Sequence, residues 1–267
     1  MQKSIKPFLI LGLVLLVSGF PDHLVAWGER KVAMKIVGPD CGLEVSYRRS
    51  WDGGRQSETY AVHAEKLTVN NVPAYQSISV YKDRVRRITM RQSDLTPLVM
   101  IEKWSQGPGL IQRTYQKNQV HVVRRGVPYP MDLQVEVPPG VHDPESFAFL
   151  LRGYPFARQN TISPINVLMA EPNPIITNPR ALGVYIIPHG AGKVKVPAGV
   201  FDCYILEMTL SSVLGYVVPN NRFWLLKNEP HLIVKAEGGG QTIELMAGPF
   251  ACDGNKHCPV RAEVPKF

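Results

Sequence analysis

Short runs of alternating apolar and polar residues, separated by turn-forming residues, recur along most of this 267-residue chain. The run from Leu43 to Arg48 alternates in this way, which is the pattern of a strand that buries one face. Turn formers follow many of the runs, as at Asn70-Asn71. Runs of extended character also cover residues 58–69, 74–81, 84–91, 98–104, 110–116, 120–124, 165–169, 184–187, 193–196, 201–210, 222–227, 231–237 and 242–246. The sequence therefore predicts a mainly β fold with one large, curved antiparallel sheet, a half-barrel or open barrel.

One segment departs from this pattern and predicts a short helix over residues 144–152. Asp143 is a favourable N-cap residue, Pro144 suits the first helical position, and Gly153 is a natural C-terminal stop. The apolar residues between them recur at helical spacing, so one face of the helix should pack on the sheet. Capping explains Asp143 and Glu145 without acid–base catalysis.

The first residues have the properties of a bacterial secretion signal. Lys3 and Lys6 precede an unbroken apolar run over residues 8–17. This run is shorter than the about 20 residues that a membrane-spanning helix needs. We expect a signal peptide over residues 1–26, with a competing cleavage site after residue 19.

The remainder, residues 27–267, is expected to form a single β-rich domain in the periplasm, without a stable membrane span. Secretion beyond the outer membrane stays open. Residues 154–181 are rich in proline and are interpreted as an irregular connection. Residues 248–267 are expected to form a C-terminal tail that contains a cysteine loop.

Four cysteines predict disulfide bonds, because an exported chain meets an oxidising environment. Cys252 and Cys258 enclose a short loop with turn residues at its centre, which suits closure by one bridge. That pairing leaves Cys41 with Cys203, one of three connectivities. His257 beside Cys258 raises a metal site as an alternative, although a zinc site normally has four ligands at recurring spacing.

The chain has no familiar catalytic motif. Neither G-x-S-x-G nor H-E-x-x-H occurs, and residues 190–193 contain only part of a phosphate-binding loop. We interpret residues 190–193 as a hairpin turn. The sequence thus predicts no catalytic residue, no cofactor and no metal, while an enzyme whose site is assembled from distant residues stays an alternative.

The net charge of +8 is positive, but charged residues make up only 19% of the chain and no nucleic-acid-binding motif occurs. We therefore expect no nucleic-acid partner. Arg84 and Arg86 share one face of a predicted strand, and Arg87 and Arg91 project from the other. These arginines are candidate contacts for anionic envelope surfaces, and charges that discourage edge-to-edge aggregation explain them equally well.

Three motifs occur in a fixed order: V-P-A-G-V-F at residues 196–201, an aromatic pair at residues 223–224, and P-H-L-I-V-K at residues 230–235. This arrangement resembles the bacterial envelope family known as domain of unknown function 3108, with Val200 in place of the usual threonine and Lys235 in place of the usual arginine. The resemblance implies an exported, β-rich protein of unassigned activity. It also implies an architecture similar to that of the periplasmic lipoprotein-localisation carriers, whose curved sheet wraps a helix and holds acyl chains.

The run over residues 201–210 is apolar on both faces, so something must cover each side. Phe201 and Ile205 lie on one face; Tyr204, Leu206 and Met208 lie on the other. The leading hypothesis is a non-catalytic periplasmic binding or envelope-assembly protein that holds a lipid or other hydrophobic ligand against one of these faces. An ordinary sandwich core explains the same pattern without a ligand. The alternatives are a basic scaffold that binds anionic envelope surfaces or a protein partner, and an envelope enzyme with an unrecognised site.

Overall fold

The computed structural model describes residues 34–36, 42–157, 160–170, 178–211 and 220–251. All of them belong to one compact unit, Lys31–Phe267. The predicted signal peptide and three of the four cysteines, Cys41, Cys252 and Cys258, lie outside these residues.

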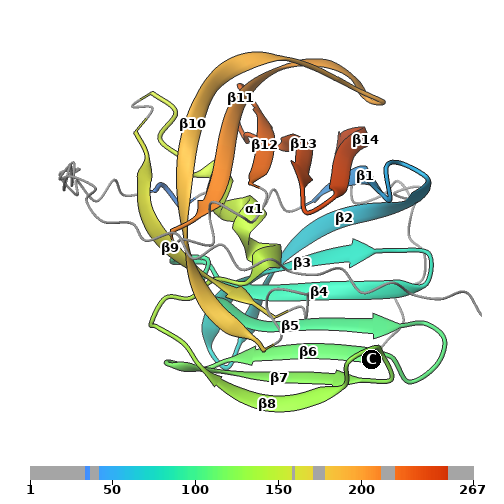
Figure 1. Ribbon diagram of the computed structural model, residues 1–267, viewed down its shortest axis with the longest axis vertical. Helices are drawn as coiled ribbons and strands as arrows, with labels where there is room; N and C mark the ends of the chain where they lie inside the picture. The colour runs from blue at the N-terminus through green and yellow to red at the C-terminus, as the bar shows by residue number, and fades with distance from the viewer. Residues whose placement is uncertain (1–33, 37–41, 158–159, 171–177, 212–219, 252–267) are drawn as a thin grey trace, which may run out of the picture. The chain divides into compact units, whose positions relative to one another are not determined.

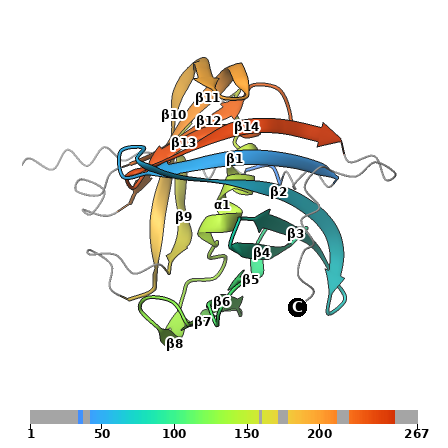
Figure 2. The ribbon, with the colours of Figure 1, turned by 90° about the vertical axis from the view of Figure 1, so that its right-hand side faces the viewer.

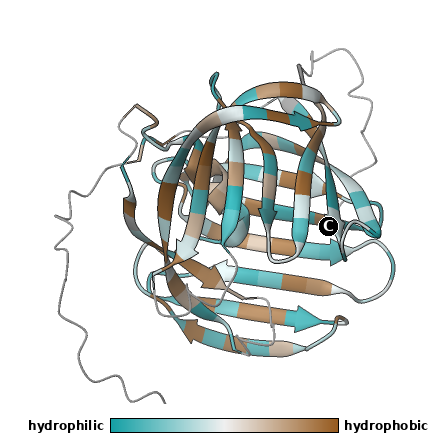
Figure 3. Cartoon of the chain, turned by 45° about the horizontal axis from the view of Figure 1, so that its top comes forward, coloured by the Kyte–Doolittle hydropathy of each residue, from teal (hydrophilic) through white to brown (hydrophobic). Residues whose placement is uncertain are grey.

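Within the described ranges, fourteen strands form a single antiparallel sheet (Figure 1). Apolar and polar residues alternate along many of the strands (Figure 3), which gives the sheet one buried face. The strands are β1 (Leu43–Trp51), β2 (Gln56–Val69), β3 (Val72–Val80), β4 (Arg84–Arg91), β5 (Pro97–Trp104), β6 (Leu110–Tyr115), β7 (Gln119–Arg125), β8 (Met131–Glu136), β9 (Ile162–Met169), β10 (Arg180–Val196), β11 (Gly199–Leu210), β12 (Asn221–Leu226), β13 (Ile233–Gly238) and β14 (Gln241–Ala251).

Two meanders meet at the middle of this sheet. The order is β8-β7-β6-β5-β4-β3-β2-β1-β14-β13-β12-β11-β10-β9, so the first and last strands of the chain are neighbours. Tyr47 of β1, for example, lies opposite Leu245 of β14. The free edges are β8 and β9, which are consecutive along the chain and are connected through helix α1 (Pro144–Arg152). Over the described residues the fold is therefore mainly β, a large open antiparallel sheet with a single helix, as the sequence predicted.

Residues 137–142 connect the two edges of the sheet. The Val137 amide donates to the Asn118 carbonyl at 2.9 Å, near the β7–β8 edge. At the other end, the His142 amide donates to Asn166 of β9 at 2.8 Å, and the Leu168 amide donates to the His142 carbonyl at 2.9 Å. The connection thus bridges the two edges of the sheet, which curls around α1 (Figure 2).

Helix α1 lies inside the curve of the sheet (Figure 2) and packs its apolar face on it. Phe147, Leu150 and Leu151 are buried in the main core cluster, and Leu151 is 0% exposed. Burying a side chain of this size contributes about 1.5–3 kcal/mol. The predicted caps are confirmed: the Asp143 carboxylate accepts from the Glu145 amide at 2.9 Å, and the Gly153 amide donates to the Leu150 carbonyl at 2.9 Å.

Two elements differ from the sequence-based prediction. Residues 190–193 do not form a hairpin turn; they lie inside the long strand β10, where a bulge between Pro188 and Ala191 accommodates the glycines. The edge strand β8 was not predicted, because its residues are mostly exposed and carry little apolar signal. Backbone pairing with β7 forms this strand instead.

Candidate functional site

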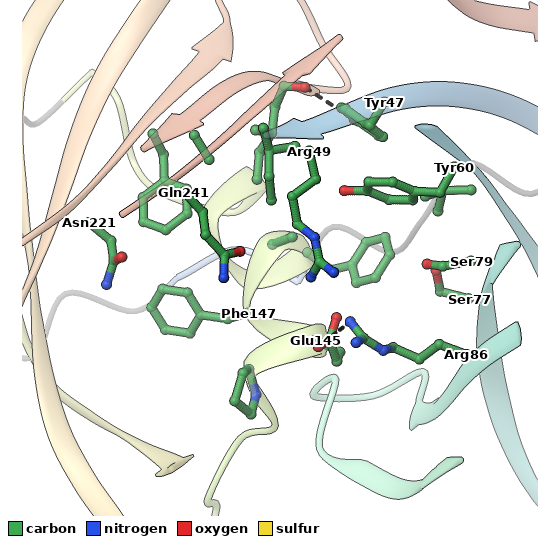
Figure 4. Close-up of a pocket in the computed structure, with 18 of the residues that line it drawn as sticks. Tyr47, Arg49, Tyr60, Ser77, Ser79, Arg86, Glu145, Phe147, Asn221 and Gln241 are labelled. Atoms are coloured by element: carbon green, nitrogen blue, oxygen red, sulfur yellow. Dashed lines mark hydrogen bonds and ion pairs between the residues drawn. The ribbon is translucent and has the colours of Figure 1, made fainter. Parts of the chain in front are cut away.

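A cavity of about 490 Å³ lies between α1 and the concave face of the sheet (Figure 4). Its wall is mainly apolar and aromatic, with side chains from both halves of the sheet and from the helix. The apolar lining comprises Val45, Val62, Pro144, Phe147, Ala148, Phe149, Val167, Met169, Ala170, Met208, Phe223, Ile233, Ala236 and Ile243. The polar lining comprises Arg49, Tyr60, Ser77, Ser79, Tyr81, Arg86, Glu145, Arg152, Asn221 and Gln241, together with Tyr47.

Three tyrosines form a stack on the wall of the cavity. The ring centroids of Tyr47 and Tyr60 are 5.7 Å apart, and those of Tyr60 and Tyr81 are 4.7 Å apart. Tyr47 and Tyr60 are cross-strand partners in β1 and β2, which places their rings on the same face. Burial raises the pKa of all three phenols. Their hydroxyl groups are therefore protonated at neutral pH and can donate hydrogen bonds.

A network of ion pairs lies beside this stack. The Glu102 carboxylate of β5 binds Arg84 at 3.0 Å and also binds Arg86, its cross-strand partner in β4. Glu58 of β2 is shared between Arg84, at 2.9 Å, and Arg49. The Arg84 guanidinium also lies 4.0 Å from the centroid of the Tyr81 ring, a cation–π contact. The guanidiniums on this wall are thus neutralised by carboxylates from neighbouring strands.

The Arg86–Glu145 pair links this network to the helix. Arg86 Nη1 lies 2.5 Å from Glu145 Oε1. Burial opposes the charge on Glu145, but the Arg86 guanidinium outweighs it and lowers the pKa of Glu145. Burial likewise opposes the charge on Arg86, and Glu145, Tyr81 and Glu102 nevertheless raise the pKa of Arg86. Both groups are therefore ionised near neutral pH.

A second anchor holds the start of α1. Arg113 Nε of β6 lies 2.9 Å from Asp143 Oδ2, and Tyr115 donates a hydrogen bond to the same carboxylate. Arg113 is 2% exposed and Asp143 is 0% exposed. Asp143 therefore caps the helix and fixes it to β6, while Glu145 fixes it to β4. Sequence reasoning identified the caps but missed both ion pairs, because Arg86 and Arg113 are distant in sequence from the helix.

The apolar side chains predicted to form a ligand face are divided by the structure. Among the five, only Met208 lines the cavity. Tyr204 and Leu206 share its face of β11 but pack in the main core cluster. Phe201 belongs to a second cluster beside β1 and β14, and Ile205 is half-buried.

The four arginines of β4 lie on opposite faces, as predicted. Arg84 and Arg86 point inward and are buried or half-buried in the ion-pair network. They therefore do not lie on the outer surface, where contacts with an anionic envelope surface would be made. The reason is that Glu58 and Glu102 occupy facing positions on the neighbouring strands. Arg91 is exposed and Arg87 is partly exposed.

The predicted disulfide bonds stay predictions, because Cys41, Cys252 and Cys258 lie outside the described residues. Cys203 is a buried free thiol, and burial raises its pKa to about 11. The thiol is therefore protonated at neutral pH and is not an activated nucleophile. In the part of the chain that the structure describes, no group of three or more His, Cys, Asp or Glu side chains is placed to hold a metal ion.

Comparisons with known proteins give no family for the chain. No family model matches it, and no curated protein matches it. The resemblance to domain of unknown function 3108 therefore stays a prediction. None of the helices in the described ranges is long and apolar enough to cross a membrane.

Two solved structures are similar to this chain. One is a β-barrel-like protein of domain of unknown function DUF1849 from Brucella abortus, with 10% identity and a TM-score of 0.44, over 80% of this chain and 97% of that one. The other is a candidate exported protein with a YmcC-like fold from Bacteroides fragilis, with 9% identity and a TM-score of 0.31, over 80% of this chain and 98% of that one.

Proposed function

We propose that this chain is a non-catalytic binding protein of the bacterial cell envelope that holds a hydrophobic ligand in the cavity beneath α1. The cavity carries the proposal: about 490 Å³ lies between the helix and the concave face of the sheet. Protein cores are otherwise packed with few voids larger than a water molecule. A mainly apolar cavity of this size falls in the range of ligand sites, about 300–1,000 Å³.

The size of the cavity supports a lipid-like ligand. About 490 Å³ of mainly apolar space is enough for an elongated apolar group such as an acyl chain. Phe147, Phe223 and Ile243 would give the acyl chain an apolar wall on both the helix and the sheet.

The charged residues of the cavity support binding rather than catalysis. A general acid or base works best when its pKa lies near the working pH. Arg86 and Glu145 instead hold each other in the ionised form. The location in the envelope rests on the signal-like residues 1–26.

Fluorescence of N-phenyl-1-naphthylamine, an uncharged apolar dye, tests the proposal. We expect the dye to bind with increased emission, and native mass spectrometry of gently purified protein to detect a co-purifying lipid. Ala148→Trp on the cavity side of α1 should abolish dye binding by filling the space. Ala191→Trp, at an exposed position of β10, is the matched control and should bind as the wild type does. If the folded wild type neither binds the dye nor carries a lipid, the proposal is wrong.

A further inference from the structure

Two sets of polar side chains in the cavity differ in whether they already have partners. The charged side chains Arg86 and Glu145 are already bonded to each other. By contrast, four hydroxyl groups on the cavity wall make no side-chain hydrogen bond within the residues that the structure describes. These hydroxyl groups belong to Tyr60, Ser77, Ser79 and Tyr81, which we call the hydroxyl cluster.

The hydroxyl cluster occupies one side of the cavity. Ser77 and Ser79 alternate on β3 and so share its inner face. Tyr60 lies on the neighbouring strand β2, stacked on Tyr81. Figure 4 shows Tyr60, Ser77 and Ser79 together on one side, with Asn221 across the cavity. Hydroxyl groups both donate and accept hydrogen bonds, so this side can bind a head that does the same.

The charged side chains beside the hydroxyl cluster already have partners. The guanidiniums of Arg49, Arg84 and Arg86 bind three carboxylates, those of Glu58, Glu102 and Glu145. Arg152, which also lines the cavity, is not without a partner either. A charged ligand head would have to displace one of these partners or stay unpaired, and an unpaired buried charge is strongly unfavourable. An uncharged head carries no such cost.

We propose that the ligand is an uncharged amphiphile of the acylglycerol type, with a head that carries hydroxyl and ester groups. This inference rests on the proposed function. The acyl chain lies against the apolar wall that includes Phe147 and Phe223, and the head bonds to the hydroxyl cluster.

Displacement of bound N-phenyl-1-naphthylamine by three ligands of equal chain length tests the inference at pH 8. The ligands are 1-monopalmitoylglycerol (uncharged), palmitate (anionic) and hexadecyltrimethylammonium (cationic), each below its critical micelle concentration. We expect 1-monopalmitoylglycerol to bind at least tenfold more tightly than either charged ligand. The affinity of the double variant Ser77→Ala/Ser79→Ala for it, taken relative to the affinity of the same variant for the dye, should fall about tenfold, equal to about 1.4 kcal/mol.

The matched control is Ser46→Ala/Ser50→Ala, which removes two hydroxyl groups from the opposite face of β1. It should bind all ligands as the wild type does. Failure of the dye to bind would contradict the proposed function itself. If the dye binds but palmitate or the cation competes as well as 1-monopalmitoylglycerol, or if the Ser77/Ser79 variant keeps full affinity for it, the inference about the head is overturned.

Discussion

The substitutions Asp143→Asn and Asp143→Ala separate the two interactions that fix the start of α1. Asparagine caps a helix about as well as aspartate, so Asp143→Asn removes the charge opposite Arg113 and keeps the cap. Breaking a buried ion pair costs about 3–5 kcal/mol. We expect a value near the lower limit, about 3 kcal/mol, because the Glu145 carboxylate also interacts with Arg113. Asp143→Ala should cost about 4 kcal/mol, since it loses the cap as well.

Urea unfolding at pH 7, followed by circular dichroism, measures both losses in the free energy of unfolding. In a thermal scan, the melting temperature of Asp143→Asn should fall by about 6–12 °C, at about 2–4 °C per kcal/mol for a domain of this size. The control is Asp132→Asn, because Asp132 is a half-exposed carboxylate that binds Arg125 at 3.0 Å. Asp132→Asn should unfold at nearly the same urea concentration as the wild type, because solvent screens an exposed ion pair.

The result that would refute the reasoning is an Asp143→Asn variant as stable as the wild type. Complete burial raises the pKa of the Asp143 carboxyl, against the effects of Arg113 and Tyr115, which favour its ionised form. Unchanged stability would mean that Asp143 is protonated in the folded state and acts only as a cap.

Three further predictions concern the rest of the fold. Burial lowers the pKa of His142, so the unfolded chain takes up its proton at higher pH than the folded one. The stability that neutral His142 provides should be present above about pH 6.5 and be lost as the pH falls; the urea midpoint should therefore fall more between pH 8 and pH 5 in the wild type than in His142→Gln, and equal falls would contradict this. Leu151→Ala should cost about 2–5 kcal/mol in urea unfolding, because Leu151 is fully buried on the face of α1 that packs on the sheet; a loss below 1 kcal/mol would mean that the helix does not pack as described. Gly126→Ala should destabilise the chain by about 1–3 kcal/mol, since Gly126 has φ +62° and a Cβ there would lie 2.7 Å from the Pro108 carbonyl carbon. Gly140→Ala, with φ +73° and open space around the Cβ, should cost less and serves as its control.

Local features of the sequence predicted most of the secondary structure. Alternation and turn chemistry act between residues that are close in the chain, so they can be read directly. Asn70 and Asn71 both adopt positive φ between β2 and β3, and Asp143, Pro144 and Gly153 delimit the helix. These residues determine where strands and helix begin and end. They also limit the fold to a mainly β class.

The tertiary structure alone decided the site. A strand pattern shows that Arg84 and Arg86 share a face, but not which face is inside. That choice depends on Glu58, Glu102 and Glu145, which come from β2, β5 and α1 and meet only when the sheet curls. The pairing of β1 with β14 and the cavity beneath α1 likewise depend on contacts between the two ends of the chain. Because a side chain's charge partners and burial are set by long-range packing, the sequence determined the elements, and the curvature of the sheet determined what they enclose.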